Sequence, residues 1–137
     1  MQLIRRERGR AAAFATVVGA AMGLALYSAP SALADTTVKG CVGIGSGVCV
    51  DVTTGSKNYS NKTQWVGWVT TRTFGGGNFT KLESWGDGFY FAKNFDGKWA
   101  NRSVQWGAQR WVRSGTNVCG AATTKDGRTI ACIRITV

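Results

Sequence analysis

Four cysteines in two close pairs constrain this chain more than any other feature of its sequence. Cys41 and Cys49 follow the first 34 residues closely, and Cys119 and Cys132 lie near the other end. Four cysteines allow three disulfide connectivities, of which we predict the local one, Cys41–Cys49 with Cys119–Cys132. Three glycines between Cys41 and Cys49 let a nine-residue loop close tightly. Neither pair has the C-x-x-C spacing of a zinc ribbon, so no metal site is expected.

The last hairpin of the chain gives a geometric reason for this pairing. Two apolar runs flank the turn segment Thr124-Lys125-Asp126-Gly127. A four-residue loop that ends in glycine pairs Thr123 with Arg128, and counting outward from that pair sets Cys119 opposite Cys132. Directly opposed residues of antiparallel strands come close enough for a disulfide. A two-residue turn at Asp126-Gly127 would instead offset the two cysteines by one diagonal step.

The first 34 residues predict a secretion signal peptide that is cleaved from the mature protein. Four arginines open the segment, residues 11–27 are apolar, and Ala32-Leu33-Ala34 offers an A-x-A cleavage site. Arg5-Arg6 raises the twin-arginine export route, but charged residues follow where that signal prefers an apolar one. We therefore expect general secretion of an extracellular, bacterial protein, with no transmembrane segment after cleavage. Residues 35–137 form one domain, in a medium that favours disulfides.

Short runs of Val, Thr, Trp, Phe and Ile, separated by glycine-bearing turns, are typical of an all-β chain. We expect a small disulfide-stapled β-sandwich of about seven to eight antiparallel strands, with a small β-barrel as the alternative. Asp96-Gly97 predicts a two-residue hairpin that pairs the strands on either side of it. Residues 35–40 are expected to be a free N-terminal strip. The predicted strands cover residues 48–54, 64–74, 78–85, 89–95, 98–106, 108–114, 116–122 and 128–137.

The sequence offers little for catalysis. It contains no histidine, which excludes Ser-His and Cys-His dyads and most zinc sites. Three of the six carboxylates after residue 34 precede a glycine, which is typical of turns. Glu83 and Asp87 are a weak candidate for a glycosidase pair in a domain this small. We therefore expect a protein that is not an enzyme, without a cofactor and without a metal.

Tryptophan is the strongest functional signal in residues 35–137, which contain six of them. Trp65 and Trp68 are three residues apart, so strand alternation sends them to opposite faces unless Gly67 forms a bulge. Trp106 and Trp111 are five residues apart and conflict in the same way. We expect one member of each pair to face outward, against the alternative that both are buried under loops. Indole rings exposed in this way stack on sugars or anchor protein interfaces.

Basic and amide side chains accompany these tryptophans and complete the predicted ligand-binding set. Thirteen basic and six acidic residues give residues 35–137 a net charge of +7, which attracts anionic polymers or serves solubility alone. The leading expectation is a binding protein for a cell-surface or extracellular polysaccharide or the cell envelope. The predicted ligand-binding residues are Trp65, Trp68, Trp106, Trp111, Arg102, Gln105, Gln109, Arg110 and Arg113.

Two other functions remain open. The second is a role directed at another secreted protein, as an inhibitor, a toxin or an adaptor subunit. An adaptor would use an open sheet edge or the N-terminal strip to add a strand to its partner. Membrane-active killing ranks third, because no amphipathic helix accompanies the positive charge, and nucleic acid ranks lowest because the protein is exported.

Overall fold

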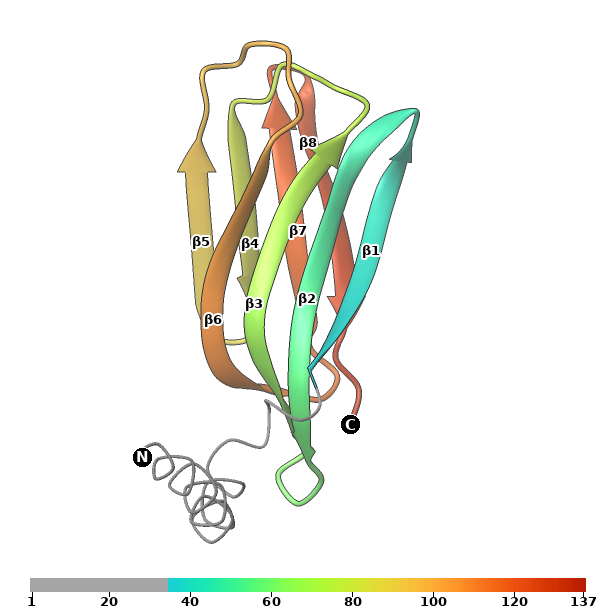
Figure 1. Cartoon of the computed structure of the whole chain (residues 1–137), viewed down its shortest axis with the longest axis vertical. Helices are drawn as coiled ribbons and strands as arrows, with labels where there is room; N and C mark the ends of the chain where they lie inside the picture. Colours follow the sequence, from blue (N-terminus) through green and yellow to red (C-terminus); the bar gives the residue numbers. More distant parts are fainter. Residues whose placement is uncertain (1–34) are drawn as a thin grey trace, which may run out of the picture.

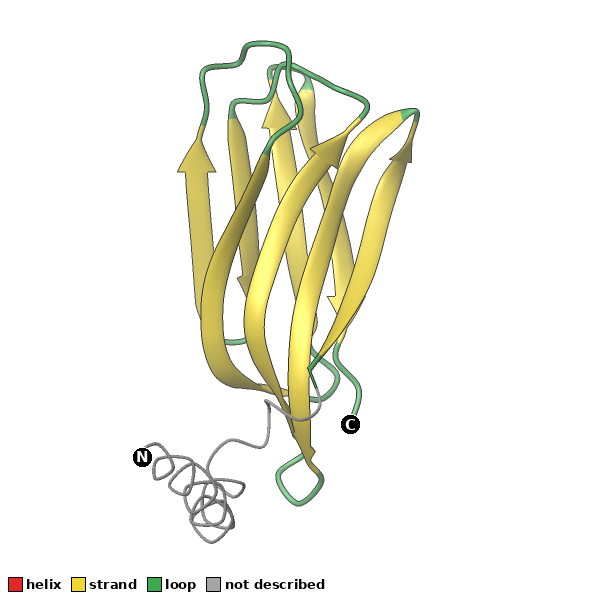
Figure 2. Cartoon of the chain, in the orientation of Figure 1, coloured by secondary structure: helices red, strands yellow, loops and turns green. Residues whose placement is uncertain are grey.

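The computed structural model describes residues 35–137, and the predicted signal peptide lies outside the described residues. In the described part, eight antiparallel strands form two four-stranded sheets without any helix (Figures 1 and 2). The chain is therefore a small all-β sandwich, as predicted, and not a closed barrel. Its strands are β1 (Thr36–Ile44), β2 (Ser46–Asn58), β3 (Thr63–Phe74), β4 (Lys81–Gly86), β5 (Phe89–Asn94), β6 (Ser103–Arg113), β7 (Asn117–Thr124) and β8 (Gly127–Arg134).

The two sheets have strand orders β1-β2-β3-β6 and β5-β4-β7-β8. Hairpins connect β1 to β2, β2 to β3, β4 to β5 and β7 to β8, and the other three connections cross between the sheets. Edge strands β1 and β8 lie together on one side of the sandwich, and β5 and β6 lie on the other (Figure 1). The outer face of each sheet carries no covering layer in the described part.

Alternating valines of β2 form the centre of the core. Val48, Val50 and Val52 are fully buried and belong to one core cluster with Leu82 of β4 and Val118 of β7. This alternation of buried and outward residues is the period of a strand with one face in the core. The side chains between these valines consequently belong to the outer face of the sheet.

Both predicted disulfides are confirmed, and each joins an edge strand to its inner neighbour. Cys41 of β1 is paired in register with Cys49 of β2, and Cys119 of β7 with Cys132 of β8. The predicted pairing of residues 123 and 128 is confirmed too, and the ladder extends one pair further, leaving a two-residue turn at Lys125-Asp126. Both bridges lie on the β1/β8 side of the sandwich.

Three sequence predictions about connections are wrong. Asp96-Gly97 does not join paired strands, because β5 and β6 belong to different sheets and residues 95–102 cross between them. Residues 35–40 are not a free strip, because β1 pairs with β2 from Thr36 onward. The predicted nine-residue glycine-rich loop between Cys41 and Cys49 is instead a paired hairpin, whose turn lies at Gly45.

Candidate ligand-binding face

A bulge at Gly67 turns two tryptophans of β3 to the same side of the sheet. The register between β2 and β3 shifts there, so that Gly67 is an extra residue on β3. Val66 and Val69 are both fully buried, whereas Trp68 is 45% exposed. Without the bulge, side chains three residues apart would lie on opposite faces. Trp65 and Trp68 therefore both point outward from the β1-β2-β3-β6 sheet.

A second irregularity, on β6, brings Trp111 beside them. Gln109 has a left-handed backbone with φ of +48°, and the register between β3 and β6 shifts around it. Trp65 is consequently directly opposite Trp111, with ring centroids 5.7 Å apart and planes inclined at 71°. Trp68 lies opposite Gly107 on the same face. We call Trp65, Trp68 and Trp111 together the tryptophan face.

The amide of Gln109 is bonded to the backbone of this face. Its Nε2 donates a hydrogen bond to the carbonyl oxygen of Gly67 at 3.1 Å. A Cβ on Gly67 would lie 3.7 Å from Nε1 of Trp65 and 4.0 Å from Nε2 of Gln109. A Cβ on Gly107 would lie 3.3 Å from the ring of Trp68. Only the Gly107 position is tight, so the absence of a Cβ there leaves room for the ring of Trp68, whereas a Cβ at Gly67 would make ordinary contacts with Trp65 and Gln109.

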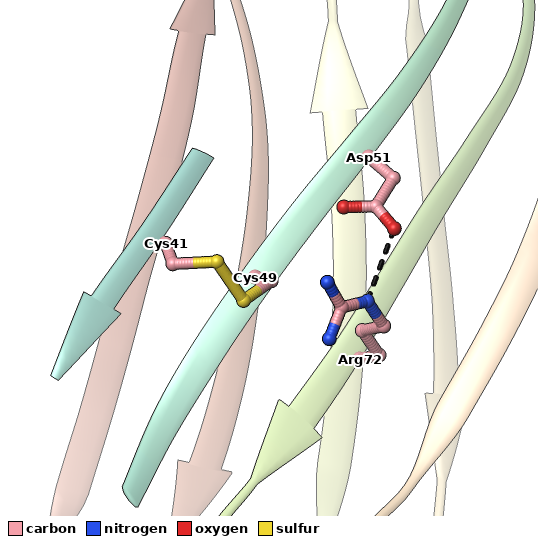
Figure 3. The surroundings of a disulfide bond; sticks show 4 residues. All are labelled: Cys41, Cys49, Asp51 and Arg72. Atoms are coloured by element: carbon pink, nitrogen blue, oxygen red, sulfur yellow. Dashed lines mark hydrogen bonds and ion pairs between the residues drawn. A yellow bond between two sulfur atoms is a disulfide. The ribbon is translucent and has the colours of Figure 1, made fainter. Parts of the chain in front are cut away.

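An ion pair and a disulfide occupy the same outer face further toward β1 (Figure 3). Arg72 of β3 donates from Nε to Oδ2 of Asp51 on β2 at 3.0 Å, and both side chains are partly exposed. Arg72 is the cross-strand partner of Cys49, so the bridge to Cys41 lies beside it. The β1/β2 half of the face is therefore polar and covalently tied, and the aromatic half lies over β3 and β6.

Trp106 lies apart from the tryptophan face. It is partly buried, packs against the core, and stacks on Phe91 of β5 with centroids 5.7 Å apart and planes inclined at 8°. Its register partner is the buried Val69, which places it on the inner side of the sheet. Gln105, opposite Thr70, is exposed on the outer face. Of the four predicted tryptophans, three come together and one joins the two sheets.

The three arginines of the predicted set lie in three different parts of the structure, and none of them is part of the tryptophan face. Arg113 donates from Nε and Nη2 to the two carboxylate oxygens of Asp87, at 2.7 and 2.8 Å. These hydrogen bonds lower the pKa of Asp87 to about 2. Arg110 lies on the inner side as the partner of Val66 and reaches the β4–β5 turn at Gly88. Arg102 lies in the β5–β6 loop, away from the tryptophan face.

The carboxylate of Glu83 is also held by neighbouring side chains. It lies on the outer face of the other sheet, where Arg128 donates to it at 3.0 Å and Lys81 lies 3.7 Å away. The hydroxyl of Tyr90 donates a hydrogen bond to its second oxygen. Burial raises the pKa of Glu83, but these hydrogen bonds and positive charges outweigh it, so that the pKa lies below its usual value.

Trp99, which is absent from the predicted ligand-binding set, is 69% exposed in the β5–β6 loop. The sequence predicts a strand over residues 98–106 that includes Trp99, because Asp96-Gly97 has the pattern of a hairpin turn. The available signal was its position, two residues after Gly97 and before a polar stretch that suits a loop. Trp85 is also absent from the predicted set, and its ring lies 4.8 Å from the guanidinium of Arg128 on the outer face of the second sheet.

Comparisons with known proteins found no match among protein-family models, curated proteins or solved structures. Within residues 35–137, no three His, Cys, Asp or Glu side chains converge as they would around a metal ion. The same residues include no helix long and apolar enough to cross a membrane. Functional inference therefore depends on the geometry of the tryptophan face itself.

Proposed function

We propose that this protein is a secreted, non-enzymatic binding protein that recognises a cell-surface or extracellular polysaccharide through the tryptophan face. The observation that carries the proposal is the double bulge that gathers Trp65, Trp68 and Trp111 on one exposed sheet surface. Indoles stack on the apolar faces of sugar rings, and three of them along two neighbouring strands offer successive contacts to a chain. Two disulfides support an extracellular location, because oxidising compartments preserve them.

Gln109 supplies the polar contact that such a ligand needs. Its amide still has one N–H and one carbonyl oxygen beyond the bond to Gly67, and planar amides suit paired hydrogen bonds to hydroxyls. Its left-handed backbone is uncommon for a residue with a Cβ. Such outliers persist where the surroundings enforce them, often at binding sites. The exposed Gln105 on the same strand extends the polar rim.

The carboxylates support a binding role over catalysis. Asp87 is engaged by Arg113 through both oxygens, and Glu83 is engaged by Arg128, Lys81 and Tyr90. Both therefore favour the ionised state, and neither suits the general acid that a glycosidase pair requires. Neither carboxylate belongs to the strands that carry the tryptophan face.

The proposal is tested with the secreted product of the full chain and insoluble cellulose, chitin, xylan and peptidoglycan. We expect retention on at least one of them, and a loss of at least about tenfold in affinity for Trp68→Ala with Trp111→Ala. Retention at 1 M salt, where the Debye length is about 3 Å, separates ring stacking from charge attraction. Tyr59→Ala is the matched control, because Tyr59 is 72% exposed in the β2–β3 turn.

Two results would overturn the proposal. One is no retention on any polysaccharide, and the other is retention that the double variant leaves unchanged. A stoichiometric protein from the culture medium that co-purifies only when Trp68 and Trp111 are present would assign the face to a protein partner instead. That outcome is the protein-directed alternative, since exposed tryptophans also anchor protein interfaces.

A further inference from the structure

A cavity of about 350 Å³ lies among four connections of the chain. These connections meet at the end of the sandwich opposite the C-terminus (Figure 1). They are the β1–β2 turn, the β3–β4 loop (residues 75–80), the β5–β6 loop (residues 95–102) and the β7–β8 turn. The volume lies at the lower end of the range of small-ligand sites. Phe79 and Ala122 line it and are almost fully buried, so its base is apolar and firm.

Trp99 lies at the rim of this cavity, and its indole packs against the backbone of Gly76. A Cβ on Gly76 would lie 2.7 Å from Nε1 of Trp99, so the indole edge rests directly on the glycine backbone. Gly76 also has φ of +77°, which residues with a Cβ rarely adopt. Most of the ring nevertheless remains exposed to solvent, at 69%. The indole of Trp99 is therefore held in place by the backbone of Gly76 while most of its surface stays accessible to a ligand.

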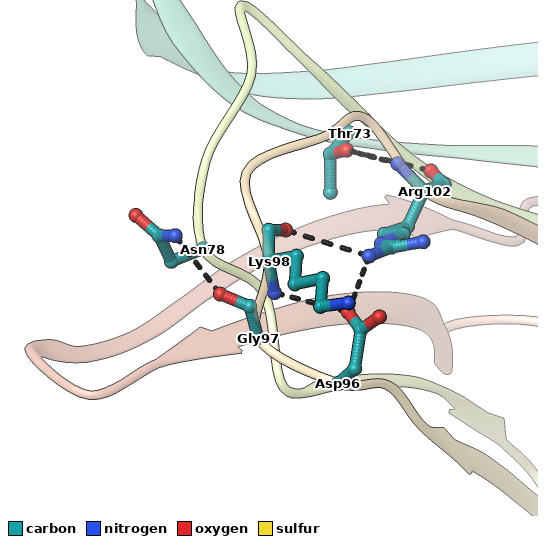
Figure 4. Close-up of polar contacts among 6 residues, drawn as sticks. All are labelled: Thr73, Asn78, Asp96, Gly97, Lys98 and Arg102. Atoms are coloured by element: carbon teal, nitrogen blue, oxygen red, sulfur yellow. Dashed lines mark hydrogen bonds and ion pairs between the residues drawn. The ribbon is translucent and has the colours of Figure 1, made fainter.

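Polar contacts fix the loop that carries Trp99 (Figure 4). Asp96 accepts a hydrogen bond from Nη2 of Arg102 at 2.7 Å, and Thr73 Oγ1 accepts one from the backbone nitrogen of Arg102 at 2.7 Å. Nδ2 of Asn78 donates to the carbonyl oxygen of Gly97 at 2.9 Å and so joins the two loops. Because these loops are already ordered, a ligand would cost little conformational entropy on binding.

The polar groups around the cavity are electrically balanced. Lys125 and Asp126, at the β7–β8 turn, contribute one charge of each sign, and neither forms an ion pair within residues 35–137. Asn78 uses its amide nitrogen toward Gly97 and keeps its carbonyl oxygen as an acceptor. An uncharged ligand rich in hydroxyls matches this combination of donors and acceptors better than an anion does.

We propose that this cavity is a second ligand site, which binds one neutral sugar unit against the indole of Trp99. Walls from four connections suit a single unit or a chain end, whereas the tryptophan face is open along the strands. Trp68 lies six residues before the end of β3, about 20 Å away along the strand. The inference rests on the proposed function for its class of ligand, but it shares no residue with the tryptophan face.

The test is an NMR titration of the isotopically labelled secreted protein with glucose, galactose, mannose and N-acetylglucosamine. We expect at least one sugar to shift the indole N–H of Trp99 and the amide of Gly77, with a millimolar Kd. Trp99→Ala and Asp126→Ala should each weaken this binding, Trp99→Ala by at least about tenfold. The Asp126 side chain makes no contact that holds the fold in residues 35–137, so Asp126→Ala remains decisive even if Trp99→Ala disturbs its loop. Tyr59→Ala, at the opposite end of the sandwich, should leave the titration unchanged.

Absence of any shift at Trp99 and Gly77 with sugar concentrations up to about 100 mM, which covers millimolar affinity, would overturn the inference. So would shifts that survive both Trp99→Ala and Asp126→Ala. The proposed function has a separate readout, since polysaccharide retention depends on Trp68 and Trp111. A protein that is retained on a polysaccharide through those rings and gives no shift at Trp99 would keep the first proposal and remove the second.

Discussion

Trp65 on β3 and Trp111 on β6 lie directly opposite each other, with their ring planes inclined at 71°. In this edge-to-face arrangement each ring packs against the other, and Trp111 is still 43% exposed. It exists because Gly67 and Gln109 each shift the register of their strand. The candidate binding surface is thus a consequence of two backbone irregularities and not of the tryptophan spacing alone.

The two kinds of tryptophan should differ in their effect on stability. Trp106→Ala removes the stacking on Phe91 between β6 and β5, and we expect it to lower the free energy of unfolding by about 3 kcal/mol. Trp68→Ala removes an exposed ring and should cost less than about 1 kcal/mol. Urea unfolding at neutral pH measures both. Equal losses would contradict the placement of Trp106 on the inner side.

Gly120 marks a close approach of the two sheets. A Cβ there would overlap the hydroxyl of Thr71 and lie 3.1 Å from Cβ of Val50, all in the buried interior. We expect Gly120→Ala to destabilise the protein by about 1 to 3 kcal/mol in urea unfolding, as overpacking does. Gly67→Ala is the control, because its nearest new neighbour lies 3.7 Å away. A neutral Gly120→Ala would mean that the sheets separate readily at this point.

The ion pair between Asp87 and Arg113 should make stability depend on acid. The pKa of Asp87 is about 2 in the folded protein, against an ordinary value of 3.8. Its contribution is therefore present above pH 3.8 and is lost as the pH falls through about 2. Over this window we expect the urea midpoint of the wild type to fall more steeply than that of Asp87→Asn. Parallel curves for the wild type and Asp87→Asn would refute the prediction.

The effect of the Tyr90–Glu83 hydrogen bond on the pKa of Tyr90 can be measured by ultraviolet absorbance. It raises the pKa of Tyr90 above 10.0, because the neutral hydroxyl donates to a carboxylate. In a Tyr59→Phe background, which leaves one tyrosine in residues 35–137, alkaline titration at the tyrosinate band follows Tyr90. We expect Glu83→Gln to lower that pKa toward its ordinary value. An unchanged titration would show that Glu83 does not control Tyr90.

Each of the two disulfides should contribute to stability. The bridges close segments with sequence separations of 8 and 13 residues. On the chain-entropy estimate, replacing Cys41 and Cys49 by alanine costs about 2.6 kcal/mol, and replacing Cys119 and Cys132 costs about 3 kcal/mol. The bridges belong to different sheets, but the backbone at Gly40, next to Cys41, lies against the carbonyl oxygen of Cys132, so the two losses in urea unfolding should not simply add. A combined loss equal to the sum would contradict this coupling between the edge strands β1 and β8.

Short-range features of the chain were predictable. The disulfide pairing and the register of β7 with β8 follow from a turn length and a glycine position, both local in sequence. The all-β class follows from alternation, as in Val48, Val50 and Val52. Such features need no knowledge of which distant strands meet, and for this reason they could be derived without a structure.

Side-chain direction in the middle of the chain was only partly predictable. Strand parity identified the conflict between Trp65 and Trp68 and named a bulge at Gly67 as its exception, but could not decide whether the bulge forms. The bulge of Gln109 had no sequence signal, because glutamine does not favour a left-handed backbone. Asp96-Gly97 predicted a hairpin between β5 and β6, but the two strands belong to different sheets. Packing across the sandwich therefore outweighs the local turn preference of these two residues.

By itself, the sequence determined a β domain with two local disulfides, a positive charge and a surplus of tryptophan. The tertiary structure alone decided that Trp65, Trp68 and Trp111 share a surface, that Trp106 is inside, and that Trp99 borders a cavity. The physical reason is that turns and disulfides depend on neighbours in sequence. The register between β3 and β6, by contrast, depends on strands more than 30 residues apart, whose pairing only the packed sandwich fixes.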